Sequence, residues 1–477
     1  MIEFGDLSIR RLVTDSRKIE LGDTFVAYVG EAADGRKFIR DALMRGAASV
    51  IWEEEGHAWD PDLHVPNMPV RNLREKSGEL ASRLYGDPSG KLHVIGVTGT
   101  NGKTSCTHWI AQAMGVLGRK TAVIGTLGNG FPGKLAPTIN TTPDAVAIQA
   151  LLAEYLEAGA QCVAMEVSSH ALTQGRVNGV RFDIALFTNL TRDHLDYHGD
   201  MEAYGSAKAM LFARPELQHA VLNADDPFGA LLLEQTVATD KIAYGFSVAN
   251  EKRWVRGKEM RSENGQMIVD VESSWGCGTL RTNALGKYNA SNLLGVLCVL
   301  LASDCGLEES LEALSGIEAV PGRMQSLGGQ GRPLVVVDYA HTPDALQNVL
   351  DALREIAKGE LVCVFGCGGD RDPGKRPMMG SIASRLADRV YVTTDNPRSE
   401  EIDAIIDQIV AGIEGDFCVV RDRKEAIFRA ISDSHGDDIV LLAGKGHEDY
   451  QEIKGKKLPF SDMEVAGSAL DAWGGRC

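Results

Sequence analysis

The sequence LHVIGVTGTNGKT at residues 92–104 joins a short apolar run to a glycine-rich loop. The run at 93–97 is typical of a buried strand, and a helical pattern at 105–117 follows the loop directly. A loop in this position binds phosphate, because its backbone N–H groups and the helix N-terminus point toward the anion. Lys103 would reach the outer phosphates of a nucleoside triphosphate, and the Thr104 hydroxyl would ligate Mg²⁺. We therefore predict a nucleotide site that comprises Gly99, Thr100, Asn101, Gly102, Lys103 and Thr104.

Further strand-like runs follow the loop and alternate with helical patterns. They lie at residues 121–124, 162–167, 184–187 and 220–223, and a second series lies at 334–338, 361–365, 390–393, 417–420 and 439–443. Alternation of short, apolar strands with helices is typical of parallel sheets that are covered on both faces. The sequence thus predicts an α/β protein.

Length and turn signals divide the chain into three expected domains. At roughly 150 residues per domain, 477 residues suggest about three. A helical pattern at 73–85 is closed by Gly86-Asp87-Pro88, where proline cannot continue the helix, and Val320-Pro321-Gly322 is a natural place for a hinge. We expect domains at residues 1–88, 89–322 and 323–477.

Composition and charge restrict the class of function. Acidic residues outnumber basic ones by 66 to 49, and the resulting net charge of −17 would repel nucleic acid and anionic membranes. No apolar run approaches the roughly 18 residues that span a bilayer, and the N-terminus lacks the pattern of a secretory signal. The nine cysteines are odd in number and form no C-x-x-C pair, which favours reduced thiols. We expect a cytoplasmic monomer that acts on small molecules and binds neither nucleic acid nor membrane.

Two side chains near the predicted nucleotide are candidates for a metal. Glu166 lies at the end of one strand-like run and His194 follows another, and such strand ends border the nucleotide crevice of a parallel sheet. Lys208 lies in a helical pattern at 204–212. Taken alone, Glu166 could equally be a surface carboxylate, His194 a capping residue and Lys208 a solvated lysine.

Several motifs together resemble those of the Mur ligase family. They are TGTNGKT at 98–104, EVSSHAL at 166–172, FTNLTRDHLDYHG at 187–199, VPGRMQ at 320–325, DYAHTPDAL at 338–346 and GKGHEDY at 444–450. Val97, where a strict phosphate loop has glycine, is the form usual in this family. The resemblance implies a first domain that holds the UDP of a substrate, a central ATP-binding domain and a Rossmann-like C-terminal domain that binds an amino acid.

The resemblance also implies a reaction in peptidoglycan biosynthesis. ATP would phosphorylate the D-glutamate carboxylate of UDP-N-acetylmuramoyl-L-alanyl-D-glutamate, and an amine would attack the acyl phosphate to form an amide. Phosphoryl transfer needs positioning and charge neutralisation more than a covalent protein group. The implied catalytic residues are Lys103, Glu166, His194 and Lys208, and the implied ligands of Mg²⁺ are Thr104, Glu166, His194 and a carbamylated Lys208.

Binding residues carry over from the same resemblance. ATP would also contact Asn292, Arg323 and Asp338. The contacts implied for the UDP-muramoyl dipeptide are Thr14, Ser16, Asn140, Thr141, Thr142, Ser168, Gln174 and Arg176. The chain departs from the family at Glu31, where relatives can have histidine.

The motif Asp395-Asn396-Pro397-Arg398 bears on which amino acid is added. By itself it reads as a turn that ends a strand, since proline restricts the preceding residue to extended conformations. Within the family it resembles the recognition motif for meso-diaminopimelate, which has one more carboxylate than lysine. Arginine binds carboxylate with two parallel hydrogen bonds, so Arg398 and Arg371 are the expected partners. Glu448 would accept from the distal ammonium, and Gly444 would offer backbone contacts.

Other functions compete with this one. One group comprises related amide-forming enzymes, namely a lysine-adding relative or a folylpolyglutamate synthase. The other comprises a P-loop kinase and a non-catalytic, nucleotide-regulated binding protein. The DNPR motif at 395–398 and the segment around Thr14 and Ser16 favour the diaminopimelate-adding ligase.

Overall fold

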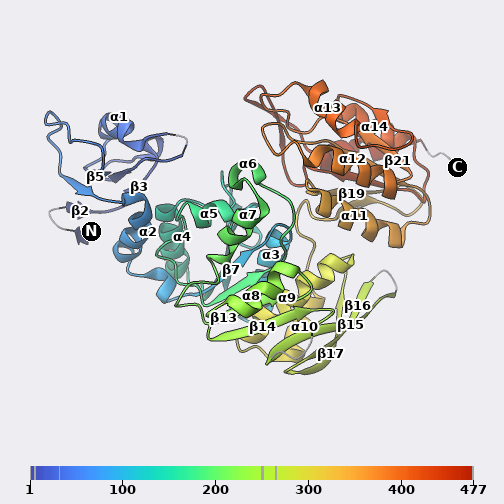
Figure 1. Ribbon diagram of the computed structural model, residues 1–477, viewed down its shortest axis with the longest axis horizontal. Coiled ribbons are helices and arrows are strands. Elements are labelled where there is room, and N and C mark those ends of the chain that lie inside the picture. The colour runs from blue at the N-terminus through green and yellow to red at the C-terminus, as the bar shows by residue number, and fades with distance from the viewer. Residues whose placement is uncertain (1, 5–6, 32, 249–251, 264–265, 475–477) are drawn as a thin grey trace.

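The computed structural model describes residues 2–4, 7–31, 33–248, 252–263 and 266–474. The chain forms three units, each built around its own sheet, and the predicted α/β fold is confirmed. Figure 1 shows the N-terminal and C-terminal units at opposite ends of the molecule, with the central unit between them. No helix in the described part of the chain is both long enough and apolar enough to cross a bilayer.

The N-terminal unit is a parallel sheet with the strand order β3-β4-β5-β6. Every residue of β4 and β5 is buried, as expected for strands that are covered on both faces. The strands of this unit are β1 (Ile2–Phe4), β2 (Leu7–Ile9), β3 (Leu12–Val13), β4 (Thr24–Ala27), β5 (Ser49–Glu53) and β6 (Asn67–Val70). Its helices and 3₁₀ turns are η1 (Ser16–Lys18), η2 (Gly35–Phe38), α1 (Ile39–Met44), α2 (Leu73–Leu84) and η3 (Pro88–Gly90).

The central unit contains an eleven-stranded sheet with the order β10-β9-β8-β11-β7-β12-β13-β14-β15-β16-β17. The strands from β8 to β14 in this order are parallel. The bounds are β7 (His93–Thr98), β8 (Thr121–Gly125), β9 (Gly128–Phe131), β10 (Lys134–Ala136), β11 (Cys162–Glu166), β12 (Ile184–Phe187), β13 (His219–Asn223), β14 (Asp240–Gly245), β15 (Arg253–Glu263), β16 (Gln266–Ser273) and β17 (Gly276–Thr282).

Helices cover both faces of this sheet, which is why β7 has a continuous apolar sequence. Val94 packs in the same core as Ile148 of α4, whereas Ile95 packs with Trp109 of α3 and Leu293 of α9. The helices are α3 (Lys103–Val116), α4 (Ala145–Glu157), α5 (Ser169–Thr173), α6 (Leu195–His198), α7 (Met201–Ala209), α8 (Pro227–Gln235), α9 (Lys287–Ala302) and α10 (Leu307–Ser315).

The central unit differs from the sequence prediction at the start of one helix and at six strands, because β9, β10 and β14 to β17 were not predicted. The helix expected at 204–212 begins three residues earlier, because the Asp200 carboxylate accepts from the backbone N–H of Ala203 and caps α7 at Met201. The antiparallel extension β15-β16-β17 was not predicted. Strand β17 has mostly exposed or half-buried residues and the sequence GCGTLRT, so it carries little of the apolar signal on which the prediction depended.

The C-terminal unit contains a six-stranded sheet with the order β18-β19-β23-β20-β21-β22, parallel except at β18. The strands of this sheet are β18 (Gln325–Gly328), β19 (Leu334–Asp338), β20 (Leu361–Phe365), β21 (Arg389–Val392), β22 (Cys418–Val419) and β23 (Ile439–Ala443). A separate antiparallel pair comprises β24 (Tyr450–Ile453) and β25 (Lys456–Pro459). The helices are α11 (Pro343–Ile356), α12 (Lys375–Leu386), α13 (Ile402–Val410), α14 (Arg423–Ser432) and α15 (Asp462–Asp471).

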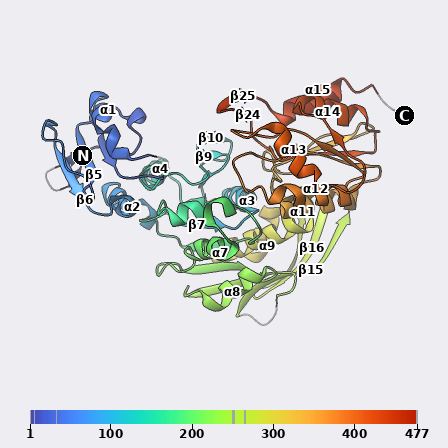
Figure 2. The ribbon, with the colours of Figure 1, turned by 45° about the horizontal axis from the view of Figure 1, so that its top comes forward.

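The central and C-terminal units meet where α9 and α11 lie side by side (Figures 1 and 2). Many of the predicted site residues lie at or just after the carboxyl ends of parallel strands: β7, β11 and β12 in the central unit, and β19, β20, β21 and β23 in the C-terminal unit. These strand ends are where open α/β sheets bind ligands.

Candidate active site

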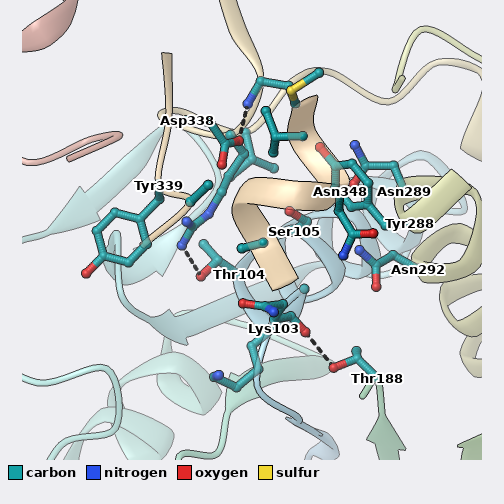
Figure 3. A pocket seen from close by; sticks show the side chains of 18 of the residues that line it. Lys103, Thr104, Ser105, Thr188, Tyr288, Asn289, Asn292, Asp338, Tyr339 and Asn348 are labelled. Atoms are coloured by element: carbon teal, nitrogen blue, oxygen red, sulfur yellow. Dashed lines mark hydrogen bonds between the residues drawn. The ribbon is translucent and has the colours of Figure 1, made fainter. Parts of the chain in front are cut away.

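A cavity of about 750 Å³ lies between the central and C-terminal units. Residues predicted from the sequence to bind ATP, metal or the UDP-muramoyl dipeptide line it, namely Thr100, Asn101, Gly102, Lys103, Thr104, Thr141, Glu166, Ser168, His194, Lys208, Asn292, Arg323 and Asp338. In Figure 3, Asp338 and Tyr339 lie on one side of the cavity, Tyr288, Asn289 and Asn292 lie on the other, and Lys103 and Thr104 lie below.

The glycine-rich loop connects β7 to the N-terminus of α3, as predicted. Gly102 has a φ of +86°, and a Cβ atom there would lie 2.5 Å from the Asn292 side chain. Glycine is therefore required at this position both for the backbone conformation and for the close approach of α9. The same contact brings Asn292, one of the expected ATP contacts, against the phosphate loop.

Two buried lysines meet at the carbonyl oxygen of Gly99. Lys103 Nζ donates to Gly99 O and Thr100 O, each at 2.8 Å, and Lys208 Nζ donates to Gly99 O, also at 2.8 Å. Burial lowers the pKa of both ammonium groups, and their mutual repulsion lowers that of Lys208 further. Lys208 is 1% exposed and forms no ion pair within the described residues. The neutral form of the Lys208 amine is thus more readily populated than that of an ordinary surface lysine.

Glu166 is the centre of a hydrogen-bond network at the end of β11. Thr104 Oγ1 donates to Glu166 Oε2 at 3.0 Å, and the backbone N–H of Thr126 donates to Glu166 Oε1 at 2.8 Å. Arg323 Nη2, from the start of the C-terminal unit, donates to Thr104 Oγ1 at 3.1 Å. The carboxylate is 1% exposed, so the alternative of a surface Glu166 is excluded.

His194 is held in the left-handed conformation with a φ of +55°. Burial lowers its pKa to about 3, although the neighbouring Asp193 opposes the shift. Its ring centre lies 4.8 Å from that of His170 in an edge-on arrangement. A neutral imidazole with a free lone pair can act as a metal ligand, whereas an imidazolium cannot. His194 is also the N-cap residue of α6, as the capping alternative expected, but its side chain makes no cap hydrogen bond.

Asp338 and Tyr339 bring the end of β19 into the cavity. Asp338 Oδ2 accepts from the backbone N–H of Met324 at 2.8 Å, and burial raises the pKa of this carboxyl. The Arg323 guanidinium lies 4.5 Å from the centre of the Tyr339 ring. Arg323 and Asp338, two expected ATP contacts, are thereby placed near Thr104 of the phosphate loop.

Five of the expected substrate residues form one connected group beside Glu166. Thr142 Oγ1 donates to Glu166 O at 2.7 Å and to Ser168 Oγ at 3.4 Å. Arg176 Nη1 donates to Thr142 O at 2.9 Å, and its Nε donates to Gln174 Oε1 at 2.7 Å. Thr141 joins through the Thr126 hydroxyl at 3.0 Å, and that hydroxyl also bonds Glu166.

The remaining substrate residues lie apart from this group. Asn140 is exposed, and its carbonyl accepts from Thr138. Thr14 and Ser16 belong to the N-terminal unit, and within the described residues neither side chain is hydrogen-bonded to the other six. Glu31 does link the units, because its carboxylate accepts from Gln174 Nε2 at 2.6 Å and from Tyr197 OH at 2.8 Å.

The two predicted acceptor arginines lie near Gly368, but only the Arg398 guanidinium packs against it. A Cβ atom at Gly368 would lie 2.9 Å from Arg398 Nη1 and 4.0 Å from Arg371 Cγ. Arg398 has a φ of +50°, a conformation that costs free energy for a residue with a side chain and is typical of functional sites. Its Nη1 donates to Gly369 O at 2.7 Å, while Arg371 is exposed and donates to Asp370 O at 2.9 Å.

Asn396 and Glu448 meet at the ends of β21 and β23. Asn396 Nδ2 donates to Glu448 Oε2 at 2.8 Å, and the fully buried Lys445 donates to both, at 3.2 Å to Asn396 Oδ1 and 3.0 Å to Glu448 Oε2. A Cβ atom at Gly444 would lie 2.7 Å from Asp395 Oδ2. That buried oxygen has no hydrogen-bond partner within the described residues, which leaves it available to a donor.

Comparison with known proteins covers nearly the whole chain. Three family models match it in order: the catalytic domain of the Mur ligase family at residues 8–85, the Mur ligase middle domain at 97–300 and the Mur ligase glutamate ligase domain at 322–446. The chain belongs to the Mur ligase family.

Relatives of this Mur ligase share its full length. The UDP-N-acetylmuramoyl-L-alanyl-D-glutamate–2,6-diaminopimelate ligase of Chromobacterium violaceum is 52% identical, over 98% of this chain and 96% of the relative. The ligase of the same name from Nitrosomonas europaea is 49% identical, over 98% and 94%. A solved structure of a ligase of that name is 36% identical and superposes with a TM-score of 0.69, over 99% of this chain and 97% of the other. The family resemblance drawn from the motifs is therefore confirmed.

Some cavity residues of the Mur ligase were not predicted from its sequence. Tyr339, His341 and Asp344 line the cavity and lie within the DYAHTPDAL motif, from which only Asp338 had been selected. Asp344 Oδ2 accepts from Asn101 Nδ2 of the phosphate loop at 3.0 Å. The motif itself was the available signal, because α11 begins within it and faces the cavity.

Proposed function

We propose that this Mur ligase adds meso-diaminopimelate to UDP-N-acetylmuramoyl-L-alanyl-D-glutamate at the expense of ATP, as a step of peptidoglycan biosynthesis in the cytoplasm. The relatives of that name, at 49% and 52% identity over almost the whole chain, support the assignment. The observation that carries the choice of amino acid is the mostly buried Arg398 guanidinium, which lies against Gly368 three residues before Arg371. We expect the enzyme to act as a monomer.

ATP fits the cavity between the central and C-terminal units. Its phosphates would lie on the backbone N–H groups of Gly99 to Thr104, its adenine near Asn292, and its ribose near Asp338. Lys103 would leave the carbonyl oxygens that it now contacts and neutralise the outer phosphates. Arg323 bonds Thr104 in this arrangement of the two units, so its guanidinium would bring a second cation to the same phosphates.

The residues beside the phosphate loop suit Mg²⁺. Magnesium is usually held by one or two carboxylates together with substrate phosphates, and it keeps several waters. Within the described residues, no cluster of three or more His, Cys, Asp or Glu side chains could hold a metal alone. Thr104, Glu166 and neutral His194, with oxygens of ATP, would complete the sites, and the metal would neutralise charge that develops on the transferred phosphoryl group.

Lys208 would serve the same sites as a carbamate. Carbamylation joins the neutral amine to CO₂, releases a proton and converts a cation into an anion. The lowered pKa of the buried ammonium group favours the neutral amine that this reaction requires. The carbamate would also remove the repulsion between Lys208 and Lys103.

The remaining residues would position the two reacting molecules. Thr14 and Ser16 would hold the uridine side of the substrate, and Asn140, Thr141, Thr142, Ser168, Gln174 and Arg176 would hold the muramoyl dipeptide so that the D-glutamate carboxylate faces the γ-phosphate. On the other side, Arg371, Arg398, Asp395, Asn396, Pro397, Gly444 and Glu448 would hold diaminopimelate. We keep the domain bounds 1–88, 89–322 and 323–477 as part of this proposal.

Closure would also protect the intermediate. The acyl phosphate forms when a carboxylate oxygen of D-glutamate attacks the γ-phosphorus and ADP leaves. The amine of diaminopimelate then attacks the acyl carbon, and phosphate leaves with that oxygen. Because water competes with the amine, the C-terminal unit must cover the acyl phosphate before it hydrolyses.

Release of inorganic phosphate tests the proposal. Purified protein should release phosphate from ATP only when UDP-N-acetylmuramoyl-L-alanyl-D-glutamate and meso-diaminopimelate are both present, and L-lysine should replace diaminopimelate poorly. Phosphate release in the absence of both would instead favour an ATPase. A stable phosphorylated product formed without an amine would favour a kinase.

A further inference from the structure

A bidentate ion pair joins the loop that carries His194 to the loop that carries Arg371. Arg192 Nε donates to Asp372 Oδ2 at 2.9 Å, and Arg192 Nη2 donates to Asp372 Oδ1 at 3.2 Å. Arg192 belongs to the central unit and Asp372 to the C-terminal unit. The Asp372 side chain is only 8% exposed, whereas that of Arg192 is 41% exposed. Paired guanidinium and carboxylate groups with two parallel hydrogen bonds fix orientation as well as distance.

Neighbouring residues tie the same two loops together. Asp193 Oδ2 lies 3.6 Å from His341 Nε2 of the C-terminal unit, and Asp193 is almost fully buried. A Cβ atom at Gly374, at the start of α12, would lie 2.5 Å from Arg192 Nη2. Three consecutive residues thus have three different neighbours. Arg192 faces the loop that carries Arg371 and Asp372, called here the acceptor loop. Asp193 faces the β19–α11 loop, and His194 faces the cavity.

The local structure of Asp372 makes this contact rigid. Its Oδ1 also accepts from the backbone N–H of Gly374 at 2.9 Å, which fixes the turn between Arg371 and α12. A displacement of Arg192 would therefore move Asp372 and, with it, Arg371, the residue that directly precedes Asp372. In the same way, the acceptor loop cannot move away from the central unit without breaking a charge-assisted pair.

We propose that the Arg192–Asp372 pair is a closure clamp that couples docking of the acceptor loop to assembly of the phosphate site. The proposal rests on the proposed function, and it assigns to both residues a positioning role rather than contact with a reacting atom. Because the pair spans the two units, it forms only when the C-terminal unit lies over the central unit. Its loss should affect use of the amino acid more than binding of ATP or of the UDP-linked substrate.

A double-mutant cycle tests the clamp. Arg192→Met and Asp372→Asn should each lower kcat/KM for meso-diaminopimelate by about 20-fold, and the double variant should be no worse than either single variant by more than about twofold. Arg192→Lys, which keeps a cation but cannot form both parallel hydrogen bonds, should recover only part of the activity. Arg354→Met is the matched control, since Arg354 pairs with Asp388 at 2.8 Å entirely within the C-terminal unit. KM for ATP and for the UDP-linked substrate should rise by much less than KM for meso-diaminopimelate, and the unfolding temperature should stay unchanged.

Three kinetic outcomes would overturn the clamp: multiplicative effects in the double variant, equal loss of affinity for all three substrates, or no effect of either single variant. Solution X-ray scattering with Mg²⁺ and a non-hydrolysable ATP analogue tests it without turnover. Arg192→Met and Asp372→Asn should both increase the radius of gyration, whereas Arg354→Met should not. Unchanged radii in all variants would also overturn it. If wild-type protein makes no amide but the radii change as expected, the proposed function fails and the clamp stands.

Discussion

In the proposed function, the choice of amino acid depends on single residues of the C-terminal unit, above all on Arg398. Arg398 is held at a φ of +50° between two backbone hydrogen bonds, one from its N–H to Glu452 O and one from the N–H of Lys454 to Arg398 O. Its side chain lies 22% exposed beside Gly368. This combination of an unfavourable backbone conformation and a mostly buried cation is stable only because the surrounding loops impose it.

Substitution of Arg398 should therefore affect the acceptor selectively. We predict that Arg398→Ala raises KM for meso-diaminopimelate by at least ~100-fold, since loss of a buried charge-assisted pair costs roughly 3 kcal/mol. KM for ATP should not change. Steady-state kinetics with each substrate varied in turn would measure both, with Arg421→Ala as control because that guanidinium pairs with Asp403 at an exposed site. An unchanged KM for diaminopimelate would show that Arg398 does not bind it.

A second prediction for a single residue concerns carbamylation of the Lys208 amine. Because burial and the Lys103 charge lower its pKa, its amine should react with CO₂ near neutral pH. Protein incubated with ¹³C-bicarbonate and Mg²⁺ should show a carbamate carbon resonance by NMR, and this resonance should be absent from Lys208→Met. Removal of CO₂ should lower activity, and bicarbonate should restore it. A wild-type spectrum without a carbamate signal would contradict the prediction.

At the scale of elements, the central strands and the phosphate loop could be predicted because they combine apolar runs with a fixed loop pattern. The strands at 184–187, 334–338, 361–365 and 439–443 were predicted with the bounds that the structure has. The predicted start of α7 was wrong because the observed start depends on one capping side chain, that of Asp200. The pairing of Arg192 with Asp372 could not be predicted, since it joins residues 180 positions apart through the docking of two units.

The functional residues also divide into those that a local motif identifies and those whose role depends on the assembled fold. Residues with a local signature, such as Lys103, Thr104 and the DNPR motif, could be found from sequence and a family resemblance. Residues such as Tyr339 and Lys445 acquire their surroundings only when strand ends from separate βα units come together. The motifs DYAHTPDAL and GKGHEDY contain these two residues, but a motif does not specify which side chains from other strand ends will surround them.

Helix α3, behind the phosphate loop, contains a histidine that should make the protein sensitive to acid. His108 is 7% exposed, its Nε2 has no hydrogen-bond partner within the described residues, and burial lowers its pKa to about 4. In the unfolded chain its pKa is near 6.5, so below that pH the unfolded state takes up a proton that the folded state does not. The stability associated with neutral His108 is thus complete above pH 6.5 and is lost as the pH falls toward 4.

Replacement of this histidine should flatten the pH dependence of stability. Between pH 7 and pH 5, wild-type protein should lose about 2 kcal/mol more stability than His108→Gln, because only the wild type has this group to protonate on unfolding. Thermal unfolding at pH 7, 6 and 5 would measure the difference. Parallel curves for the two proteins would show that His108 is protonated equally in both states.

At the scale of the whole molecule, three units divide the reaction between them. The central unit contains the phosphate loop, the C-terminal unit contains the loops that we propose bind the amino acid, and the cavity of about 750 Å³ lies where the two units meet. Hydrogen bonds from Arg323 to Thr104 and from Asn101 to Asp344 join the two units across this boundary. In the proposed reaction, the D-glutamate carboxylate lies on the central unit and gives one of its oxygens to the phosphate that is released. The amine of diaminopimelate approaches from the C-terminal unit.

The fate of that oxygen is the most direct test. UDP-N-acetylmuramoyl-L-alanyl-D-glutamate labelled with ¹⁸O in the side-chain carboxylate of D-glutamate would be turned over with ATP and meso-diaminopimelate, and both products would be analysed by mass spectrometry. Transfer through an acyl phosphate predicts one ¹⁸O in each released phosphate and one in the new amide. Phosphate that carries no label, or a product that keeps both labelled oxygens, would contradict the proposed ligase reaction.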